Sequence, residues 1–484
     1  MFSRVFSLRV ALALAIGLTE IVFLTYRADA GLEIALSSAA VTLALLVQLR
    51  YALRADAPVP ADIAVFIFNW LFLDLAPKIQ LISDPQRLVN TSSVTNEGVA
   101  ITNLVCALFI GTFTFFYATL TSRGVRANAS IAARTPQPEL TAGGIAVTLF
   151  ICLLIVVAAA PYAYHAIEDQ AVISPGLLII KRYLLFLPSA ALLILLQETL
   201  RRPRKILFTR ACIIAIFLVM LLVTENPYTE KRNALGPLYV SLLLIVFQKW
   251  FSTRTRRLLL LIGAMVLVFP AISVFTHNHN QALTDVSFAQ LGERIEEHYL
   301  SINYDAWANV YTSIEIVARH GVQWGHQLLG SLLFFVPSSV WTGKPLATGI
   351  FLARYLINHY GMWFTNLSAP LVAEAYLDFG WLGVITYASI LAFLVASLNS
   401  LALSSDRRAN IPMALYGSMF LMFLLRGSLI VAMGFAVAAF LSFTTASALL
   451  SMNLGAQRRQ SPPAVGRPPS TTPRPRGLSH GLQP

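Results

Sequence analysis

The chain has 484 residues, of which 57% are hydrophobic and only 12% are charged, with a mean hydropathy of +0.68. Soluble globular domains average about 25% charged residues, so this composition excludes a soluble globular protein. The net charge of +12 would suggest nucleic-acid binding in a soluble chain. Here the lysines and arginines lie mainly in short segments between apolar runs and in the tail, as the positive-inside rule requires, and we expect no nucleic-acid partner.

Twelve apolar runs predict twelve transmembrane helices, because a helix needs roughly 17 to 25 predominantly apolar residues to cross a bilayer. The first run lacks a small-residue cleavage site before Arg27, so we interpret it as a helix and not as a signal peptide. The predicted fold class is therefore an all-α, polytopic integral membrane protein. The runs lie at about 6–26, 32–49, 60–81, 98–121, 141–163, 174–199, 206–224, 234–250, 257–275, 380–402, 411–425 and 428–451.

The lysines and arginines between these runs divide unequally between two alternating sets of segments. With the N-terminus inside, the inside segments hold 22 of them and the short outside loops hold 5. Cytoplasmic loops carry an excess of lysine and arginine, so this ratio supports an even number of helices with both chain ends in the cytoplasm. It places the long segment between the ninth and tenth helices outside.

That long segment, 276–365, is polar, aromatic and charged, and six of the eight histidines lie in it. A membrane anchor needs no such segment, whereas a protein that binds or converts a polar substrate at the bilayer surface does. We therefore expect the function there. The predicted regions are membrane helices 1–9 in 1–275, an outer loop with amphipathic helices in 276–365, membrane helices 10–12 in 366–452, and a disordered basic cytoplasmic tail in 453–484.

The sequence contains no phosphate-binding loop, no dinucleotide fingerprint and no zinc-binding HExxH motif. Cys106, Cys152 and Cys212 lie in apolar runs at no metal-ligand spacing, so we expect neither a metal site nor another cofactor. The predicted cytoplasmic loops are too short to form a nucleotide-sugar-binding domain. A substrate for group transfer would therefore reach the outer face already activated, as a lipid-linked donor.

Two stretches of the loop contain candidate cations. Glu315 and Arg319 have the i,i+4 spacing of a surface helix pair, although Arg319 lies where a helix is expected to end near the membrane. Two prolines and a glycine in 335–345 forbid a regular helix, and Trp341 favours the bilayer interface. Lys344 would then lie at headgroup depth, where it suits a phosphate; the alternative is an ordinary interfacial anchor.

Two pairs of ionisable residues lie one helical turn apart. Glu374 and Asp378 precede the tenth predicted span, and a carboxylate at that depth is costly unless it is partnered. Glu374 is therefore a functional candidate, with a structural salt bridge to an arginine as the alternative. Asp74 and Lys78, in the third span, are interpreted as a structural pair.

Four further cations lie near the predicted outer face. Arg232 and Arg426 each lie at the outer end of a predicted helix, and Lys181 and Arg182 lie inside a span close to that face. Together they could bind a pyrophosphate, because arginine offers bidentate hydrogen bonds to phosphate oxygens.

Several short motifs follow one another in a fixed order along the chain. They are Arg232 at the start of the eighth span, Tyr304-Asp305, Pro337, Trp341, Lys344-Pro345, Gly349, Glu374 through Gly380, Gly383 and Arg426-Gly427. This order resembles the Wzy-type O-antigen and oligosaccharide repeat-unit polymerases. The resemblance is strongest over about 290–430 and elsewhere rests on topology. One departure is that no two loops each carry an evenly spaced arginine motif, so donor and acceptor sites are unassigned.

The resemblance implies that the protein joins undecaprenyl-diphosphate-linked repeat units on the outer face of the bacterial inner membrane. It implies lipid-linked oligosaccharides as substrates, membrane lipids around the helices, and a chain-length regulator and a flippase as partners. Glu374 would be the base that removes the acceptor proton, with His359 in reserve. Arg232, Arg319, Lys344, Arg354 and Arg426 would neutralise the diphosphate without a divalent ion, and Trp341 and Asp305 would also bind substrate.

Three alternatives stay open on the sequence. An O-antigen ligase would use similar cations and a loop histidine, and only the Glu374 segment and Lys344-Pro345 favour the polymerase. A lipid-linked oligosaccharide flippase or other transporter predicts ionisable residues along several spans, whereas here they cluster near one face. A structural membrane subunit leaves the charges of the loop unexplained.

Overall fold

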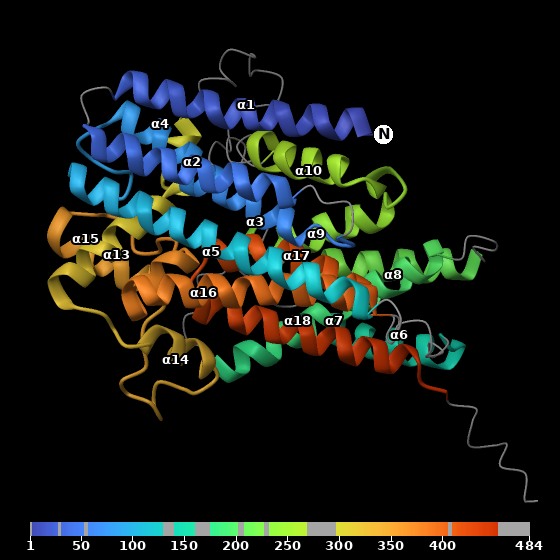
Figure 1. The fold of residues 1–484 in the computed structure, drawn as a ribbon. Helices are drawn as coiled ribbons and strands as arrows, with labels where there is room; N and C mark the ends of the chain where they lie inside the picture. The colour runs from blue at the N-terminus through green and yellow to red at the C-terminus, as the bar shows by residue number, and fades with distance from the viewer. Residues whose placement is uncertain are drawn as a thin grey trace, which may run out of the picture.

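The computed structural model describes residues 2–27, 31–52, 57–128, 140–159, 175–201, 208–226, 232–268, 297–404 and 409–453. Within these residues the regular structure is helical and contains no β-strand, which confirms the predicted all-α class (Figure 1). The predicted disordered tail beyond 453 and the first part of the predicted loop, up to 296, lie outside the described residues.

The described residues up to 128 form five α-helices, of which two make up one predicted span. Within the third predicted span, α3 and α4 are joined by a π-helical turn, Leu71–Leu75. Pro77 follows this turn and lacks the amide hydrogen that a regular helix would use, so a wider turn before it is expected. The helices are α1 (Phe2–Tyr26), α2 (Leu32–Ala52), α3 (Ala61–Trp70), α4 (Ala76–Ser83) and α5 (Asn96–Asn128).

The rest of the chain continues as helices, and the apolar stretch near the end divides into two. Arg426, Gly427 and Ser428 separate α17 from α18, as the sequence predicts. The helices are α6 (Ala142–Ala159), α7 (Pro175–Arg201), α8 (Phe208–Thr224), α9 (Arg232–Val246), α10 (Arg254–Gly263), α13 (Ala306–His320), α14 (His326–Leu332), α15 (Thr348–Tyr360), α16 (Leu371–Leu403), α17 (Asn410–Arg426) and α18 (Leu429–Leu450).

Seven of the described helices are long and apolar enough to cross a membrane. They occur in α1, α2, α3 with α4, α5, α7, α16 and α18, and four shorter apolar helices coincide with further predicted spans. On α1 the side chains of Leu14, Leu18 and Ile21 are all more than 60% exposed, which suits a surface that faces lipid. These helices indicate a membrane protein, and the count of twelve spans stays a prediction because the ninth run continues beyond the described residues.

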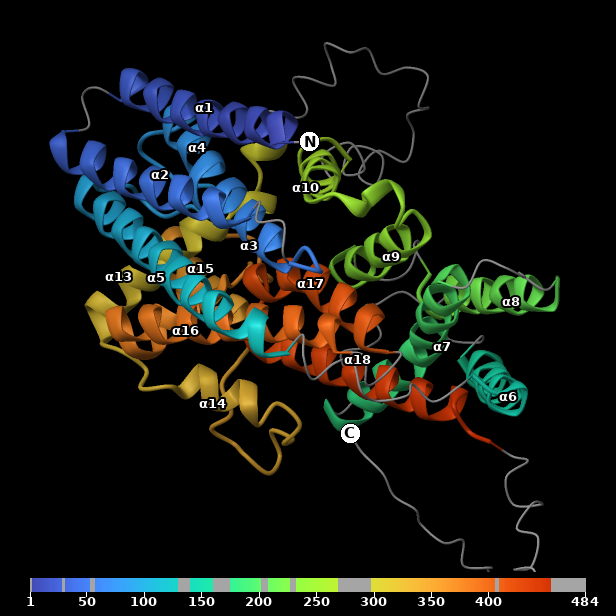
Figure 2. The same cartoon turned by 45° about the vertical axis from the view of Figure 1, so that its right-hand side comes forward.

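The described part of the predicted loop gathers at one end of the helical bundle. In both views α13, α14 and α15 lie at the end opposite the first residues of α1 and the last turn of α18 (Figures 1 and 2). Most of α13 is buried, since it packs against α5 and α16. Its Trp307 is fully buried and donates a hydrogen bond to Asn103 of α5 over 3.1 Å. This segment is therefore part of the helical body.

Helix α16 is broken into two segments near its start. It begins at Leu371, nine residues before the predicted span, and Phe379 and Gly380 leave the helical conformation. Gly380 has φ 60° and ψ −139°, a conformation open only to glycine. A side chain on Gly383 would meet the carbonyl oxygen of Ala375 at 1.9 Å, so the two segments approach closely. Glu374 and Asp378 thus belong to a short first segment of this helix.

A buried ionic cluster joins α1, α2, α4 and the π-helical turn that precedes α4. The predicted pair of Asp74 and Lys78 is confirmed, because the two side chains form an ion pair. Lys78 Nζ also lies 2.7 Å from Glu20 Oε2 of α1. The same Glu20 oxygen accepts hydrogen bonds from the hydroxyls of Ser38 and Thr42 on α2, over 2.8 and 2.9 Å. One ammonium thus faces two carboxylates inside the bundle.

Candidate functional site

The corner between α17 and α18 is where segments distant in the sequence meet. The amide of Ala369 donates to the carbonyl of Arg426 over 3.0 Å. The amide of Gly349, at the start of α15, donates to the hydroxyl of Ser428 over 2.9 Å. A side chain on Gly349 would meet the carbonyl oxygen of Leu367 at 2.1 Å, so only glycine fits there. The polar loop is therefore fastened to the membrane helices at this corner.

Glu374 lies against the same corner and is only 1% exposed. Its Oε1 accepts the amide hydrogen of Leu429 over 2.9 Å, at the N-terminus of α18, where the helix dipole favours a carboxylate. The hydroxyl of Thr348 lies beside it. Its Oε2 is buried and has no hydrogen-bond partner among the described residues. No described lysine or arginine forms an ion pair with Glu374, so the alternative of a structural salt bridge is not supported.

At Asp378, one turn further along, each carboxylate oxygen accepts at least one hydrogen bond. It accepts hydrogen bonds from the amides of Gln327 and Leu328 over 3.0 and 2.9 Å, and from the hydroxyl of Tyr387 over 2.6 Å. Its carboxylate therefore satisfies the free amides at the start of α14. Asp378 fixes α14 to α16 and has no free oxygen for a substrate.

Arg426 faces the buried carboxylate of Asp305, with 3.8 Å between its Nη2 and Oδ1. The other oxygen of Asp305 accepts hydrogen bonds from the Asn309 side chain and the Ser368 amide, over 2.9 and 3.1 Å. The guanidinium lies 5.8 Å from the ring centre of Phe72 and its side chain is 21% exposed. Its Nε is buried without a hydrogen-bond partner among the described residues, and the 3.8 Å contact of Nη2 with Asp305 is too long for a hydrogen bond, so this guanidinium keeps donors for a further anion.

Lys344 and Trp341 lie in the irregular turn that the two prolines and the glycine predict. The ammonium of Lys344 donates to the carbonyls of Phe334 and Val336, over 2.7 and 2.8 Å. Partial burial lowers the pKa of Lys344. The ring of Trp341 packs edge-to-face on His326, with 6.1 Å between ring centres. Lys344 therefore closes this turn with two of its three N–H donors, which leaves one donor for a phosphate.

Three further predicted site residues, Arg319, His359 and Arg354, lie on the surface of α13 and α15. Arg319 pairs with Glu315 over 2.6 Å and is 49% exposed, so the surface ion pair is confirmed. His359 stacks on Tyr355 with 4.2 Å between ring centres, and its Nδ1 lies 2.8 Å from the carbonyl oxygen of the same residue. Arg354 is exposed. No contact between described residues joins these three side chains to Glu374 or to the Arg426 corner.

Arg232 begins α9, and its side chain lies outside the described part of the structure. The prediction that it faces the diphosphate therefore stays a prediction. Arg182 is buried in α7 with its guanidinium 4.9 Å from the ring centre of Phe435, within the bundle. No described contact joins Arg182 to Arg426.

The sequence analysis missed several neutral polar residues that hold the site. The side-chain amide of Gln80, in α4, donates to the carbonyls of Tyr299 and Tyr304 over 2.9 and 3.1 Å. Asn90, in the connection before α5, donates to the side chain of Asn309 over 2.9 Å. Burial raises the pKa of the Tyr304 phenol, which keeps this residue neutral. Only Asn309, one turn after Asp305, could have been noticed from its spacing.

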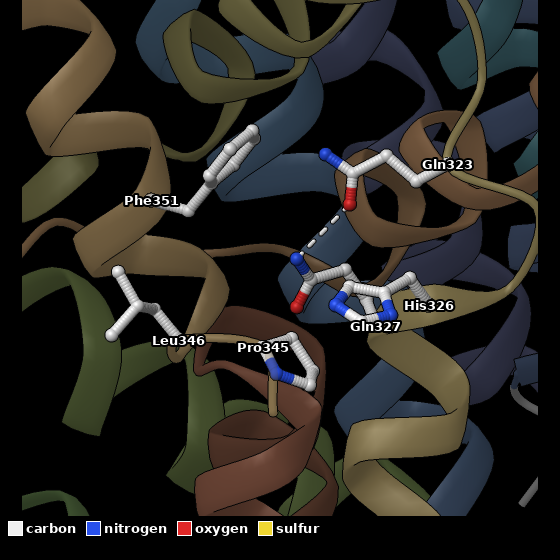
Figure 3. Close-up of a pocket in the computed structure, with 6 residues that line it drawn as sticks. All are labelled: Gln323, His326, Gln327, Pro345, Leu346 and Phe351. Atoms are coloured by element: carbon white, nitrogen blue, oxygen red, sulfur yellow. Dashed lines mark hydrogen bonds between the residues drawn. The ribbon is translucent and has the colours of Figure 1, made fainter. Parts of the chain in front are cut away.

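A pocket of about 370 Å³ opens between α14, the turn before α15, and α15 itself (Figure 3). Gln327 Nε2 donates to Gln323 Oε1 over 3.1 Å. Gln327 Oε1 accepts from the hydroxyl of Thr348 over 3.1 Å, and Thr348 is the residue beside Glu374. The lining residues are Gln323, His326, Gln327, Pro345, Leu346 and Phe351.

No protein-family model, no curated protein and no solved structure matches this chain. The helices define the class of the molecule, an all-α membrane protein with a polar, partly buried cluster at one end. What the protein does has to be argued from this cluster and from the residues that form it.

Proposed function

We propose that this protein is a membrane glycosyltransferase that polymerises undecaprenyl-diphosphate-linked oligosaccharide repeat units on the outer face of the bacterial inner membrane. The observation that best supports the proposal is the corner between α17 and α18. Residues of the motifs that resemble Wzy-type polymerases contact this corner from three separate segments: Asp305, Gly349 and Glu374. A protein that only needed anchoring would have no reason to assemble a buried carboxylate and an incompletely bonded arginine there.

The proposed topology has twelve spans, cytoplasmic chain ends and an outer loop between the ninth and tenth helices. Two observations support it. The distribution of lysine and arginine, 22 against 5, favours this orientation. The elements α13, α14 and α15 also lie at the end of the bundle opposite the start of α1 and the end of α18 (Figures 1 and 2).

In the proposed reaction the donor is the growing glycan on its lipid diphosphate, and the acceptor is a sugar hydroxyl of a new lipid-linked unit. The acceptor oxygen forms a bond to the anomeric carbon of the donor while the bond to the diphosphate oxygen breaks. The hydroxyl proton passes to the free Oε2 of Glu374, which acts as the base, with His359 as the alternative. The lipid diphosphate leaves with the bonding electrons, and Arg426 neutralises its charge. No described contact brings Arg319, Lys344 or Arg354 to Arg426, and the side chain of Arg232 lies outside the described part, so their share in binding the diphosphate stays a prediction.

The glycan profile of a strain that lacks the gene tests this function. A polymerase predicts that a single repeat unit is still attached to the final acceptor and that longer chains disappear. Long unattached lipid-linked chains would instead identify a ligase, and the absence of repeat units from the outer face would identify a flippase. Either of these two results contradicts the proposal.

Reporter fusions test the topology. Fusions after Arg126, Arg204 and Arg256, and in the tail, are expected to report the cytoplasm, because these positions lie in the positively charged segments. Fusions within 280–330 are expected to report the outer side. A cytoplasmic signal from that segment would overturn the proposed orientation and with it the location of the reaction.

Removal of divalent cations is expected to leave polymerisation by the purified protein unchanged. The proposed site neutralises the diphosphate with guanidinium and ammonium groups, which are charged at neutral pH without any ion. The measurement is the length distribution of the product with and without EDTA. If activity disappears and returns on addition of Mg²⁺ or Mn²⁺, a metal and not arginine holds the diphosphate.

A further inference from the structure

The pocket in Figure 3 is not used by the chemistry proposed above, and its lining contains no lysine, arginine, aspartate or glutamate. The six side chains comprise two amides, one imidazole, and the apolar groups of Pro345, Leu346 and Phe351. Its volume of about 370 Å³ lies within the range of small-molecule sites. Phosphate recognition depends on arginine, lysine or clustered amide donors, so this lining suits a neutral ligand better than the diphosphate.

The polar groups of the pocket have hydrogen-bonding capacity to spare. The oxygen of Gln323 accepts from Gln327, and the oxygen of Gln327 accepts from Thr348. The side-chain amide nitrogen of Gln323 and both ring nitrogens of His326 make no hydrogen bond to any residue that the structure describes. Amide N–H groups donate and an imidazole both donates and accepts, which matches a ligand that offers several hydroxyls.

The apolar residues face the polar ones across the opening. Figure 3 shows Leu346 and Phe351 on one side, and Gln323, His326 and Gln327 on the other. A sugar ring combines an apolar C–H face with hydroxyls at its edges. This pairing of an apolar wall with an amide wall therefore fits an uncharged sugar ring.

The polar side of the pocket is held rigidly by the first segment of α16. The backbone amide of Gln323 donates to the carbonyl of Leu377 over 2.8 Å, and Asp378 accepts from the backbone amide of Gln327 over 3.0 Å. Gly325 has φ 80°, and a side chain there would lie 2.6 Å from the ring of Phe379. The segment that contains Glu374 thus also positions the backbone of the two glutamines.

We propose that this pocket binds an uncharged sugar ring of the glycan, through Gln323, Gln327 and His326 on one side and Leu346 and Phe351 on the other. For its ligand class this inference rests on the proposed function. It goes further because it assigns the sugar and the diphosphate to different groups: the sugar to amide, imidazole and apolar side chains near α14, and the diphosphate to cations.

Saturation-transfer NMR on the full-length protein in lipid nanodiscs tests the inference. The probes are methyl glycosides of glucose, galactose, mannose, rhamnose and N-acetylglucosamine, measured one at a time. We expect at least one to bind, and we expect Gln323→Leu and the pocket-filling Leu346→Trp to abolish its signal. The control is Asn358→Leu, which removes an exposed amide of α15 outside the pocket and should keep the signal.

Three results would overturn the inference: no glycoside binds the parent protein, both pocket variants bind like the parent, or inorganic pyrophosphate displaces the glycoside. Thermal melting of each variant identifies loss of fold, and a variant that melts early is replaced by Gln323→Ala, which removes the same side-chain amide without adding bulk and should also weaken binding. The gene-deletion profile separates the two proposals. If the deletion strain keeps a normal glycan profile but glycoside binding depends on Gln323, the proposed polymerase activity is wrong and the sugar site stands. If the deletion strain makes single repeat units but no glycoside binding depends on Gln323, only the sugar site is wrong.

Discussion

Arg426→Ala is expected to lower the rate of polymerisation per folded molecule by about 100-fold or more, as loss of one donor to a developing anion typically does. Arg426→Lys should lose less, because lysine keeps the charge but not the two parallel hydrogen bonds of a guanidinium. The structural reason is that Arg426 is held near Asp305 by a 3.8 Å contact and retains free donors. The measurement is product formation by purified protein from lipid-linked repeat units, normalised to monodisperse protein.

A double variant separates substrate binding from a structural role. Asp305 is only 1% exposed, so Arg426→Ala leaves a buried carboxylate without its cation, and breaking a buried pair costs roughly 3–5 kcal/mol. Asp305→Asn removes that unpaired charge. If Arg426 only neutralises Asp305, combining Asp305→Asn with Arg426→Ala should restore both stability and activity. If Arg426 binds the diphosphate, the double variant should regain stability and stay inactive.

Glu374→Gln is expected to abolish turnover, by a factor of about 10²–10⁴ for loss of a general base, while donor binding stays largely intact. The substitution keeps a carbonyl oxygen that can accept from the Leu429 amide, so the contact with α18 survives. It replaces the unpartnered Oε2 with a group that cannot take a proton. A well-folded Glu374→Gln protein that polymerises at the parental rate would make the base assignment wrong, and His359→Gln would be the next variant to measure.

Asp378→Asn is the matched comparison for Glu374→Gln, because the two carboxylates are one turn apart in the same segment of α16. Asp378 accepts three hydrogen bonds, and an asparagine NH₂ group would face at least one of these donors. Leaving a buried donor without an acceptor costs about 1–3 kcal/mol. We therefore expect Asp378→Asn to lower the melting temperature, whereas Glu374→Gln should lower the rate with little change in stability.

The features that the sequence predicted correctly depend on local patterns. The helical class follows from the length and polarity of the apolar runs, and the pair of Asp74 and Lys78 follows from i,i+4 spacing. The break between α17 and α18 follows from one arginine followed by glycine and serine within an apolar stretch. The ion pair of Glu315 and Arg319 likewise needs only helical spacing.

The features that could not be predicted depend on contacts between distant segments. Lys344 lies in an irregular turn, and nothing in the sequence indicates that carbonyls of the same turn would hold its ammonium. Glu374 and Asp378 lie one helical turn apart among similar apolar neighbours, so the sequence does not distinguish them. Only Asp378 accepts hydrogen bonds from the backbone amides of α14. The start of α16 before Gly380 was missed because the predicted span counted only apolar length, and the pocket was missed because its amides are neutral.

The buried cluster of Glu20, Asp74 and Lys78 has a consequence for how the chain enters the membrane during synthesis. Glu20 lies within the apolar stretch of α1, whereas its only described cation, Lys78, is synthesised after α2 and α3. An acidic residue at the centre of a lone helix costs about 2.5–3.5 kcal/mol during insertion by the translocon. Release of α1 into lipid should therefore wait until α4 emerges, and Lys78→Ala should show its first defect as slow or failed insertion of the first four helices, before any substrate is bound.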